Sequence, residues 1–489
     1  MKKLLIVVAL TGVIAALAIG AAAMAAVPAS DSGVAAGGTQ TYIILYKQMG
    51  VPSDTAKTVQ AAGGTVINSF DAIGVAVVRS ANPLFGKKMQ ADSRVEGAAS
   101  TAGYGMQLSD EIGEVFDADQ LATAAVSGTW GDPLSGAQWD MVQIHVPEAY
   151  AITGGSPSVV VGDIDTGLDY THPDLAANVD FANSVSVVGG VPDQSPAAWN
   201  DDNGHGTHTA GTIAAAANGI GIVGVAPNVK IAAIKAGNAD GFFFPEAVIA
   251  AFMWAGSHHI DVVNNSYFAD PWLFNSRNDP EQRAIWKAEM RAIKYAMSQG
   301  VTVVAAMGNE NMDLSKTNID TISPDTDPNP TPRVVTNASV VIPVEIPGVI
   351  GVTANGAKLQ KSYYSSYGVG VTQVVAPGGD RRFQNPGDGS GGYVLSTVPG
   401  GYALAQGTSM AAPHVTGVAA LIISQFGKLP PGRVQALINN TADPQPPAPN
   451  PFNPGPPFIF PATCTGGLGY NSFYGHGQVN ALSAVNAMP

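Results

Sequence analysis

Short runs of β-branched and apolar residues alternate with helical patterns from residue 138 to the end of the chain. Such alternation is typical of a parallel sheet whose crossover helices cover both faces. A helix is also predicted at 279–298, because this segment starts with Asp-Pro-Glu and is followed by Gly300. The sequence therefore predicts an α/β domain, with a three-layer αβα architecture and a mostly parallel sheet, over residues 138–489. The expected strands are 158–164, 230–236, 261–267, 301–307 and 349–354.

A smaller set of elements precedes this domain, at residues 40–99. Strands are predicted at 41–46, 64–69 and 73–79, with a helix at 53–62. A unit of this length buries too little apolar surface to be very stable alone, so we expect it to dock on something larger. Residues 103–136 lose this periodicity and collect Gly, Ala, Asp and Glu, which is typical of a linker.

The first 25 residues have the three parts of an export signal. Lys2 and Lys3 are followed by an apolar run and then by small residues that end at Ala25. A membrane anchor is the alternative, because the apolar stretch with its alanine tail just reaches spanning length. The small residues at its end favour cleavage. We therefore expect a secreted, extracellular protein with no membrane association after signal removal.

The composition is that of a globular protein with an acidic surface. Apolar residues make up 46% of the 489 positions and charged residues 12%, which does not suit a disordered or coiled-coil protein. The net charge of −14 argues against nucleic acid as a partner, because phosphate binding needs clustered Lys and Arg. The single cysteine, Cys464, cannot form an intramolecular disulfide, so the core must hold the fold.

A carboxylate and a histidine follow one another in positions where they could meet. The strand at 158–164 runs into Asp163-Ile-Asp165-Thr-Gly, and His205 lies in the first turn of a predicted small-residue helix. Either aspartate could orient a histidine, because residues two apart on a strand face the same side. The strand pattern alone leaves Asp163 and Asp165 equally eligible.

A serine and an asparagine complete the candidate chemistry. Ser409 lies at the start of another predicted helix, where backbone amides without internal partners would stabilise a developing oxyanion. Asn309 follows Gly308 after the strand at 301–307. Alone, the serine would be a helix cap and the asparagine a turn residue.

Together these segments resemble the catalytic motifs of the subtilisin-like serine peptidases. The matching motifs are Asp165-Thr-Gly, His205-Gly-Thr-His, Gly308-Asn309 and Gly407-Thr-Ser409-Met-Ala-Ala-Pro-His. The order Asp, His, Ser distinguishes this family from α/β-hydrolases and chymotrypsin-like enzymes. The resemblance covers most of the chain from residue 138 and selects Asp165 over Asp163. It implies that residues 40–99 are a ferredoxin-like α+β propeptide, which assists folding, inhibits the enzyme and is cut away.

The resemblance also implies a role for each site residue. Ser409 would attack the scissile carbonyl, His205 would act as general acid and base, and Asp165 would orient the imidazole. Asn309 would join the Ser409 amide in an oxyanion hole. Catalysis would need no cofactor, and we expect a monomer that acts on proteins or peptides. The residues expected to bind substrate are Ser266, Tyr267, Phe268 and Gly308.

Structural calcium is also implied by the resemblance. Asp174 and the loop 216–222, with Asn218 near its centre, align with a calcium site of many relatives. Carboxylate, amide and backbone oxygens are the ligands that a hard cation prefers. The loop carries few carboxylates, which leaves a metal-free loop as the alternative.

Two other functions compete with proteolysis. A binding protein without activity would have no physical need for an acid, a base, a nucleophile and an amide donor at these positions. An esterase or lipase would place its serine in a G-x-S-x-G elbow before its acid and histidine, whereas Ser409 is followed by Met-Ala and comes last. The sequence therefore predicts a secreted serine endopeptidase that is made as a precursor and processes itself.

Overall fold

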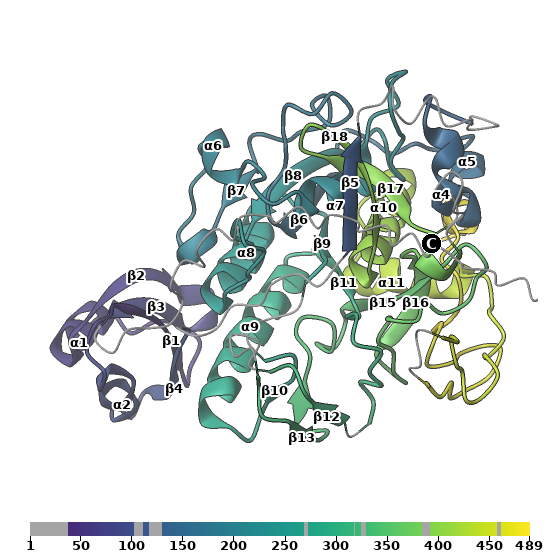
Figure 1. Cartoon of the computed structure of the whole chain (residues 1–489). Helices are drawn as coiled ribbons and strands as arrows, with labels where there is room; N and C mark the ends of the chain where they lie inside the picture. Colours follow the sequence, from purple (N-terminus) through teal and green to yellow (C-terminus); the bar gives the residue numbers. More distant parts are fainter. Residues whose placement is uncertain are drawn as a thin grey trace, which may run out of the picture.

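The computed structural model describes residues 38–101, 111–116, 130–267, 272–316, 318–323, 329–383, 392–456 and 461–489. They form a small N-terminal unit that lies against a much larger domain (Figure 1).

The N-terminal unit, residues 38–101, is an antiparallel sheet with two helices. Its strand order, β2-β3-β1-β4, together with the chain order βαββαβ, gives the expected ferredoxin-like arrangement. Its elements are β1 (Gln40–Tyr46), α1 (Thr55–Ala62), β2 (Gly64–Phe70), β3 (Val75–Ser80), α2 (Phe85–Gln90) and β4 (Val95–Ser100). The sequence pattern missed α2 and β4. The small residues of β4 have weak strand preference, and its pairing with β1 makes it a strand.

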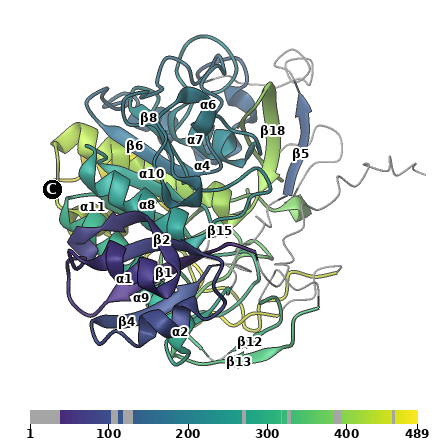
Figure 2. The same cartoon turned by 90° about the vertical axis from the view of Figure 1, so that its left-hand side faces the viewer.

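Alternation along β1 divides its side chains between two cores. Tyr42 and Ile44 pack with α1 and α2 on one face of the small sheet. Ile43 and Leu45 point the other way and pack in one cluster with α8 (Pro245–Ser257) and α9 (Pro280–Ser298) of the large domain. The small sheet therefore covers these two helices, as Figure 2 shows from the side.

The large domain is built on a seven-stranded sheet in which every neighbouring pair is parallel. Its strands, from edge to edge, are β16 (Thr372–Pro377), β15 (Ile350–Asn355), β11 (Thr302–Ala306), β9 (Val262–Asn265), β6 (Val160–Asp165), β8 (Lys230–Lys235) and β7 (Val185–Ser186). Five of these were predicted. The two edge strands were not predicted. β7 has only two residues, and β16 has too few β-branched apolar residues to form a clear strand pattern.

Helices cover both faces of this sheet, which confirms the three-layer fold. Val304 and Ala306 of β11 pack with one set of helices, while Val303 and Ala305 face α8 and α9. The first set is α7 (His205–Ala214), α10 (Thr408–Phe426), α11 (Pro431–Thr441) and α12 (Ala481–Asn486). Short elements elsewhere are α4 (Trp139–Gln143), α5 (Val146–Ala149), α6 (Pro196–Trp199), β10 (Asn275–Ser276), β12 (Asn318–Asp320), β13 (Arg333–Val335) and β14 (Ser339–Val340).

The segment predicted as a linker contains a strand. β5 (Glu111–Phe116) pairs antiparallel with β18 (Gly401–Gln406), which itself pairs with β17 (Val394–Val398). The alternation in Glu-Ile-Gly-Glu-Val-Phe was too short to stand out among the surrounding Gly and Ala. The strand exists because a partner distant in sequence supplies its hydrogen bonds.

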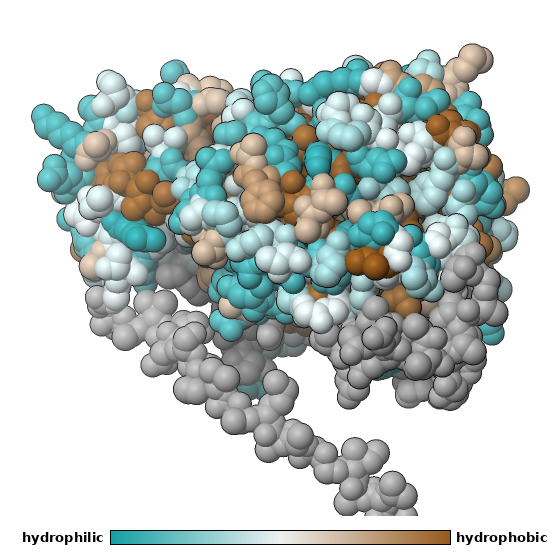
Figure 3. Space-filling model, turned by 90° about the horizontal axis from the view of Figure 1, so that it is seen from above, coloured by the Kyte–Doolittle hydropathy of each residue, from teal (hydrophilic) through white to brown (hydrophobic). Residues whose placement is uncertain are grey.

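Among the described helices, α10 alone has the length and apolar composition to cross a membrane, and 83% of its apolar window is buried inside the protein. Over the part of the upper face that the structure describes, hydrophobic residues form small groups among polar ones (Figure 3).

Candidate active site

Three of the candidate residues lie just where neighbouring parallel strands end. Asp165 is the last residue of β6, Ser266 follows β9, and Asn309 lies three residues beyond β11. Because β6, β9 and β11 are adjacent, their carboxyl ends meet at one edge of the sheet. α7 and α10, which begin at His205 and Thr408, pack against each other over the same face.

A buried hydrogen bond joins Asp165 to His205. The distance from Asp165 Oδ1 to His205 Nδ1 is 2.7 Å, and the two side chains are 0% and 1% exposed. The backbone N–H of Thr166 donates to the same carboxylate oxygen at 2.7 Å. This contact fixes the ring, and Nε2 is the nitrogen that faces away from the carboxylate.

Asp163 has different partners, although it shares a face of β6 with Asp165. Its carboxyl accepts from Thr209 Oγ1 at 2.7 Å and from Asn264 Nδ2 at 2.9 Å. Burial, and then the nearby Asp165 carboxylate, raise the pKa of Asp163 well above its usual value. The geometry therefore separates the two aspartates that the strand pattern left equivalent, and places Asp165 on the histidine.

Asp201 holds the start of α7 and was missed by the sequence reasoning. Its carboxylate accepts from the backbone N–H groups of Gly204 and Thr207, each at 2.9 Å, and from the Thr166 hydroxyl at 3.0 Å. Burial acts to raise the pKa of Asp201, but these hydrogen bonds outweigh it and lower the pKa. An acid four residues before His205, at a helix start, was the available signal.

Ser409 and Ser266 exchange two hydrogen bonds. The Ser409 hydroxyl donates to the Ser266 carbonyl at 3.1 Å, and the Ser266 hydroxyl donates to the Ser409 carbonyl at 2.8 Å. Pro413 lies four residues after Ser409 in α10 and has no N–H, so the usual helical bond to the Ser409 carbonyl is absent. Ser266 supplies the replacement and links the start of α10 to β9.

Asn309 is oriented by Thr408. Its amide oxygen accepts from the Thr408 backbone N–H at 2.8 Å and from the Thr408 hydroxyl at 2.9 Å. These two donors distinguish the oxygen of the amide from its nitrogen. Gly308, with a φ of 99°, turns the chain after β11 and donates its own N–H to Thr408 Oγ1 at 3.0 Å. Thr408 lies inside a recognised motif, but nothing in its local pattern predicts this contact with Asn309.

Tyr267 lies inside the protein rather than lining an open surface. Its ring, 4% exposed, stacks on Phe243 with centroids 4.3 Å apart, and its hydroxyl donates to Asn265 Oδ1 at 3.0 Å. Phe268, the next predicted substrate-binding residue, lies outside the described residues.

The predicted calcium loop has one group that suits a cation. Asp174 Oδ2 accepts from the Ile222 N–H at 3.0 Å and from the Tyr402 hydroxyl at 2.7 Å, while within the described residues the buried Oδ1 has no hydrogen-bond partner. Burial raises the pKa of Asp174, which a bound cation would offset. Asn218 Oδ1 accepts from the Ile220 N–H at 3.1 Å. No group of three or more His, Cys, Asp or Glu forms a metal cluster in the described part.

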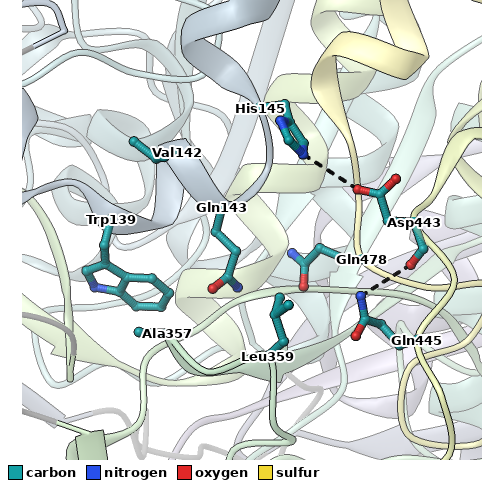
Figure 4. Close-up of a pocket in the computed structure, with 9 residues that line it drawn as sticks. All are labelled: Trp139, Val142, Gln143, His145, Ala357, Leu359, Asp443, Gln445 and Gln478. Atoms are coloured by element: carbon teal, nitrogen blue, oxygen red, sulfur yellow. Dashed lines mark hydrogen bonds and ion pairs between the residues drawn. The ribbon is translucent and has the colours of Figure 1, made fainter.

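Two cavities lie apart from these residues. One, of about 400 Å³, is lined by α4, the loop after β15 and the residues around Asp443. At this cavity, His145 Nε2 lies 3.8 Å from Asp443 Oδ2 (Figure 4). The other, of about 520 Å³, lies beside the proline-rich segment 446–451. Asp165, His205, Asn309 and Ser409 line neither cavity.

The arrangement can support nucleophilic chemistry. A buried carboxylate holds an imidazole, a hydroxyl lies at the start of a helix, and an amide side chain is fixed beside that helix start by Thr408.

Comparisons with known proteins point to one family. Residues 156–477 match the model of the subtilase family. The chain is 30% identical to M-protease of Shouchella clausii, over 78% of this chain and 76% of that protein. It is 31% identical to subtilisin DY of Bacillus licheniformis, over 67% of this chain and 91% of that protein. It is 32% identical to fervidolysin of Fervidobacterium pennivorans over 64% of this chain, and the match spans 41% of that longer protein.

Solved structures agree on the fold. The epidermin leader peptide processing serine protease of Staphylococcus aureus superposes with a TM-score of 0.68 at 22% identity, covering 92% of this chain and 99% of that one. The fervidolysin crystal structure gives a TM-score of 0.65 at 24% identity, covering 92% of this chain and 61% of the other. The chain therefore belongs to the subtilase family of serine-type endopeptidases.

Proposed function

We propose that this protein is a secreted endopeptidase that hydrolyses peptide bonds through an acyl-enzyme formed on Ser409. The observation that carries the proposal is the buried 2.7 Å hydrogen bond between Asp165 and His205, in a domain where Ser409 opens α10 over the same sheet edge. Family membership supports the same chemistry.

In this mechanism His205 Nε2 takes the proton of the Ser409 hydroxyl as its Oγ attacks the scissile carbonyl. The same proton then passes to the leaving amine, and a water molecule hydrolyses the acyl-enzyme by the reverse sequence. Asp165 keeps Nδ1 protonated and stabilises the imidazolium. In the reacting state the Ser409 proton would pass to His205 Nε2 and not to the Ser266 carbonyl, which also accepts from this hydroxyl at 3.1 Å.

The oxyanion would be bound by Asn309 and by the Ser409 backbone N–H. The Ser409 N–H lies in the first turn of α10, where backbone N–H groups have no acceptor within the helix, so it would donate to a developing negative charge. Thr408 holds the Asn309 oxygen, so the amide nitrogen is the group that would donate to the oxyanion. Loss of such a donor is known to lower kcat by about 10²–10³ in a subtilisin, and we expect the same scale here.

An extended protein or peptide substrate would bind beside β9 and Gly308. Main-chain pairing at Ser266 and Tyr267 is the expected mode, because the Tyr267 ring is packed and its hydroxyl is bonded internally. The Tyr267 ring would then support the wall of the subsite by packing, and its hydroxyl would not contact the substrate.

The chain would be made as an inactive precursor. Residues 1–25 would direct export, 40–99 would inhibit the domain at 138–489 and assist its folding, and 103–136 would link the two. Docking of the small sheet on α8 and α9 supports this division. The mature enzyme would be a monomer outside the cell, with calcium at Asp174 and Asn218 as a structural ion.

The test uses three versions of the protein: the parent, Ser409→Ala, and Ser158→Ala as a matched control at an exposed serine. The parent and the Ser158→Ala protein are expected to digest an unfolded protein, to react with a fluorophosphonate and to release the N-terminal unit. Ser409→Ala is expected to do none of these and to accumulate as the precursor. Equal digestion by the Ser409→Ala protein, or no digestion by the parent, would contradict the proposal.

A further inference from the structure

Lys361 is a buried lysine that the proposed mechanism does not use. Its side chain is 0% exposed, and its Nζ donates to Asn311 Oδ1 at 2.6 Å and to the Ser362 carbonyl at 3.2 Å. The rings of Tyr367 and Phe473 lie 5.2 and 5.4 Å from the ammonium. Lysine is almost never fully buried, because desolvating its charge is costly. The contacts of the buried Lys361 must therefore offset this desolvation cost.

Burial changes the pKa of Lys361. Desolvation first, and then the charge of Arg382, lower the pKa of Lys361 to about 7, while Asp380 acts in the opposite direction. Both the ammonium and the neutral amine carry N–H groups, so the bond to Asn311 is available on either side of that pH.

The acceptor, Asn311, lies two residues after Asn309 and has an unusual backbone. Its φ of 53° is in the left-handed region, which asparagine adopts more readily than most residues. Its backbone N–H donates to the Tyr364 carbonyl at 2.6 Å. The turn that follows Asn309 is therefore fixed both through the backbone of Asn311 and through its side chain.

Further hydrogen bonds join the same two segments. The Ser366 N–H donates to the Gly308 carbonyl at 2.9 Å, and the Met312 N–H donates to Ser366 Oγ at 3.2 Å. Asn309 thus lies between two anchors, Thr408 on one side and the segment 361–367 on the other. Lys361 supplies one side-chain contact of the second anchor, at 2.6 Å, and Ser366 supplies others.

We infer that Lys361 is a positioning residue for the oxyanion donor: by binding Asn311, it fixes the turn that aims the amide of Asn309. The inference rests on the proposed function, since it assigns Lys361 a role in the step that Asn309 stabilises. Donor groups must be placed within a fraction of an ångström, and a misplacement of about 1 Å can cost on the order of 10² in rate.

The first experiment replaces Lys361 by methionine, which keeps most of the volume and removes the donor. We expect kcat on a peptide substrate to fall about tenfold, while KM changes less than about twofold, because the oxyanion forms only in the transition state. Lys358→Met is the matched control, since Lys358 is exposed and lies three residues earlier. It is expected to keep the parent kcat. A Lys361→Met enzyme with unchanged kcat would overturn the inference.

A double-mutant cycle separates positioning from a general structural effect. If Lys361 acts through Asn309, then adding Lys361→Met to an Asn309→Ala enzyme should lower kcat less than about twofold. A full tenfold loss in the Asn309→Ala background would mean that Lys361 acts elsewhere, and would also overturn the inference.

A second variant covers the case in which Lys361→Met does not fold. Asn311→Gly keeps the left-handed turn at no steric cost and removes the side-chain oxygen that accepts from Lys361. It is expected to show the same loss of kcat and the same absence of effect in the Asn309→Ala background; an unchanged kcat would count against the inference. An inactive parent would refute the proposed function, whereas an active parent with unaffected variants would refute only the role of Lys361.

Discussion

Two carboxyl groups near His205, those of Asp163 and Asp201, have pKa values that are shifted in opposite directions. Asp163 has two donors and is shifted toward its neutral form by burial and by Asp165. Asp201 accepts from several backbone and hydroxyl donors at the start of α7 and is shifted toward its ionised form. Negative charge is therefore favoured at the positive end of a helix, and disfavoured at the buried Asp163 beside the Asp165 carboxylate.

Asp201→Asn is expected to weaken the start of α7. The pKa of Asp201 is lowered in the folded protein, so its stabilisation is present above the unfolded value of about 3.9 and is lost as the pH falls through the lower folded value. The free energy of unfolding of the Ser409→Ala precursor should fall by about 1–2 kcal/mol at pH 7. Urea unfolding at pH 7 and pH 3 measures this.

The control for this prediction is Asp240→Asn, at an exposed aspartate. It should leave the unfolding free energy within about 0.5 kcal/mol of the parent. A loss for Asp201→Asn that stayed as large at pH 3 as at pH 7 would show that the carboxylate charge is not the cause.

At the scale of single residues, the sequence identified those whose type and spacing form a motif. Asp165, His205 and Ser409 belong to such motifs, and the geometry brings Asp165 to His205 as expected. Lys361 could not be found this way. Its significance lies in its burial and in a contact with Asn311, 50 positions away, and neither is visible in a local pattern.

At the scale of elements, α8 and α9 each bury one acidic residue. Glu289 of α9 is 0% exposed, and within the described residues neither of its carboxyl oxygens has a hydrogen-bond partner. Burial, and then Glu246 of α8, raise the pKa of Glu289 well above its usual value. Burial also raises the pKa of Glu246, against a hydrogen bond from Thr101 and the charge of Arg79 on β3.

The folded precursor should therefore lose stability as the pH rises. Both groups have raised pKa values in the folded protein, so their stabilising contribution is complete below about pH 4.3 and is lost as the pH rises through the raised values. Between the two pKa values of one group the loss is about 1.4 kcal/mol per pH unit. Glu289→Gln mimics the protonated form and should stabilise the Ser409→Ala precursor at pH 8 but not at pH 4.5.

Urea unfolding of the precursor at the two pH values checks this, with Glu148→Gln as the control at an exposed glutamate of α5. If Glu289→Gln raised the free energy of unfolding equally at both pH values, protonation of Glu289 would not be the cause.

Elements with strong local patterns were predicted, and elements defined by their partners were not. β11 is apolar from Val303 to Ala306 because both faces of its sheet are covered. β4, β5 and β16 have weak patterns, and long-range pairing with β1, β18 and β15 makes them strands.

For the whole molecule, the alternation of strands and helices was enough to predict the layers. It could not predict which face the N-terminal unit would cover, because that depends on how the completed surface of α8 and α9 matches the small sheet.

Calcium is expected to stabilise the mature protein. At a concentration about 100 times its dissociation constant, a bound ion adds about 2.7 kcal/mol, or roughly 5 °C in Tm for a protein of this size. Thermal unfolding with calcium, with magnesium and with a chelator measures the effect, and Asp174→Asn should remove the response to calcium. Identical melting with calcium and chelator would exclude the ion.

Because β5 pairs with β18, the position at which the N-terminal segment is cut would also affect aggregation of the protein. A cut before Glu111 leaves the β17–β18 hairpin with its edge covered, whereas a cut after Phe116 allows β5 to leave and opens the backbone groups of β18 to strands from other molecules. β18 leads directly into Gly407 and Ser409. The position of one peptide cleavage would thus decide whether the edge of β18, next to Ser409, is covered or is open to aggregation.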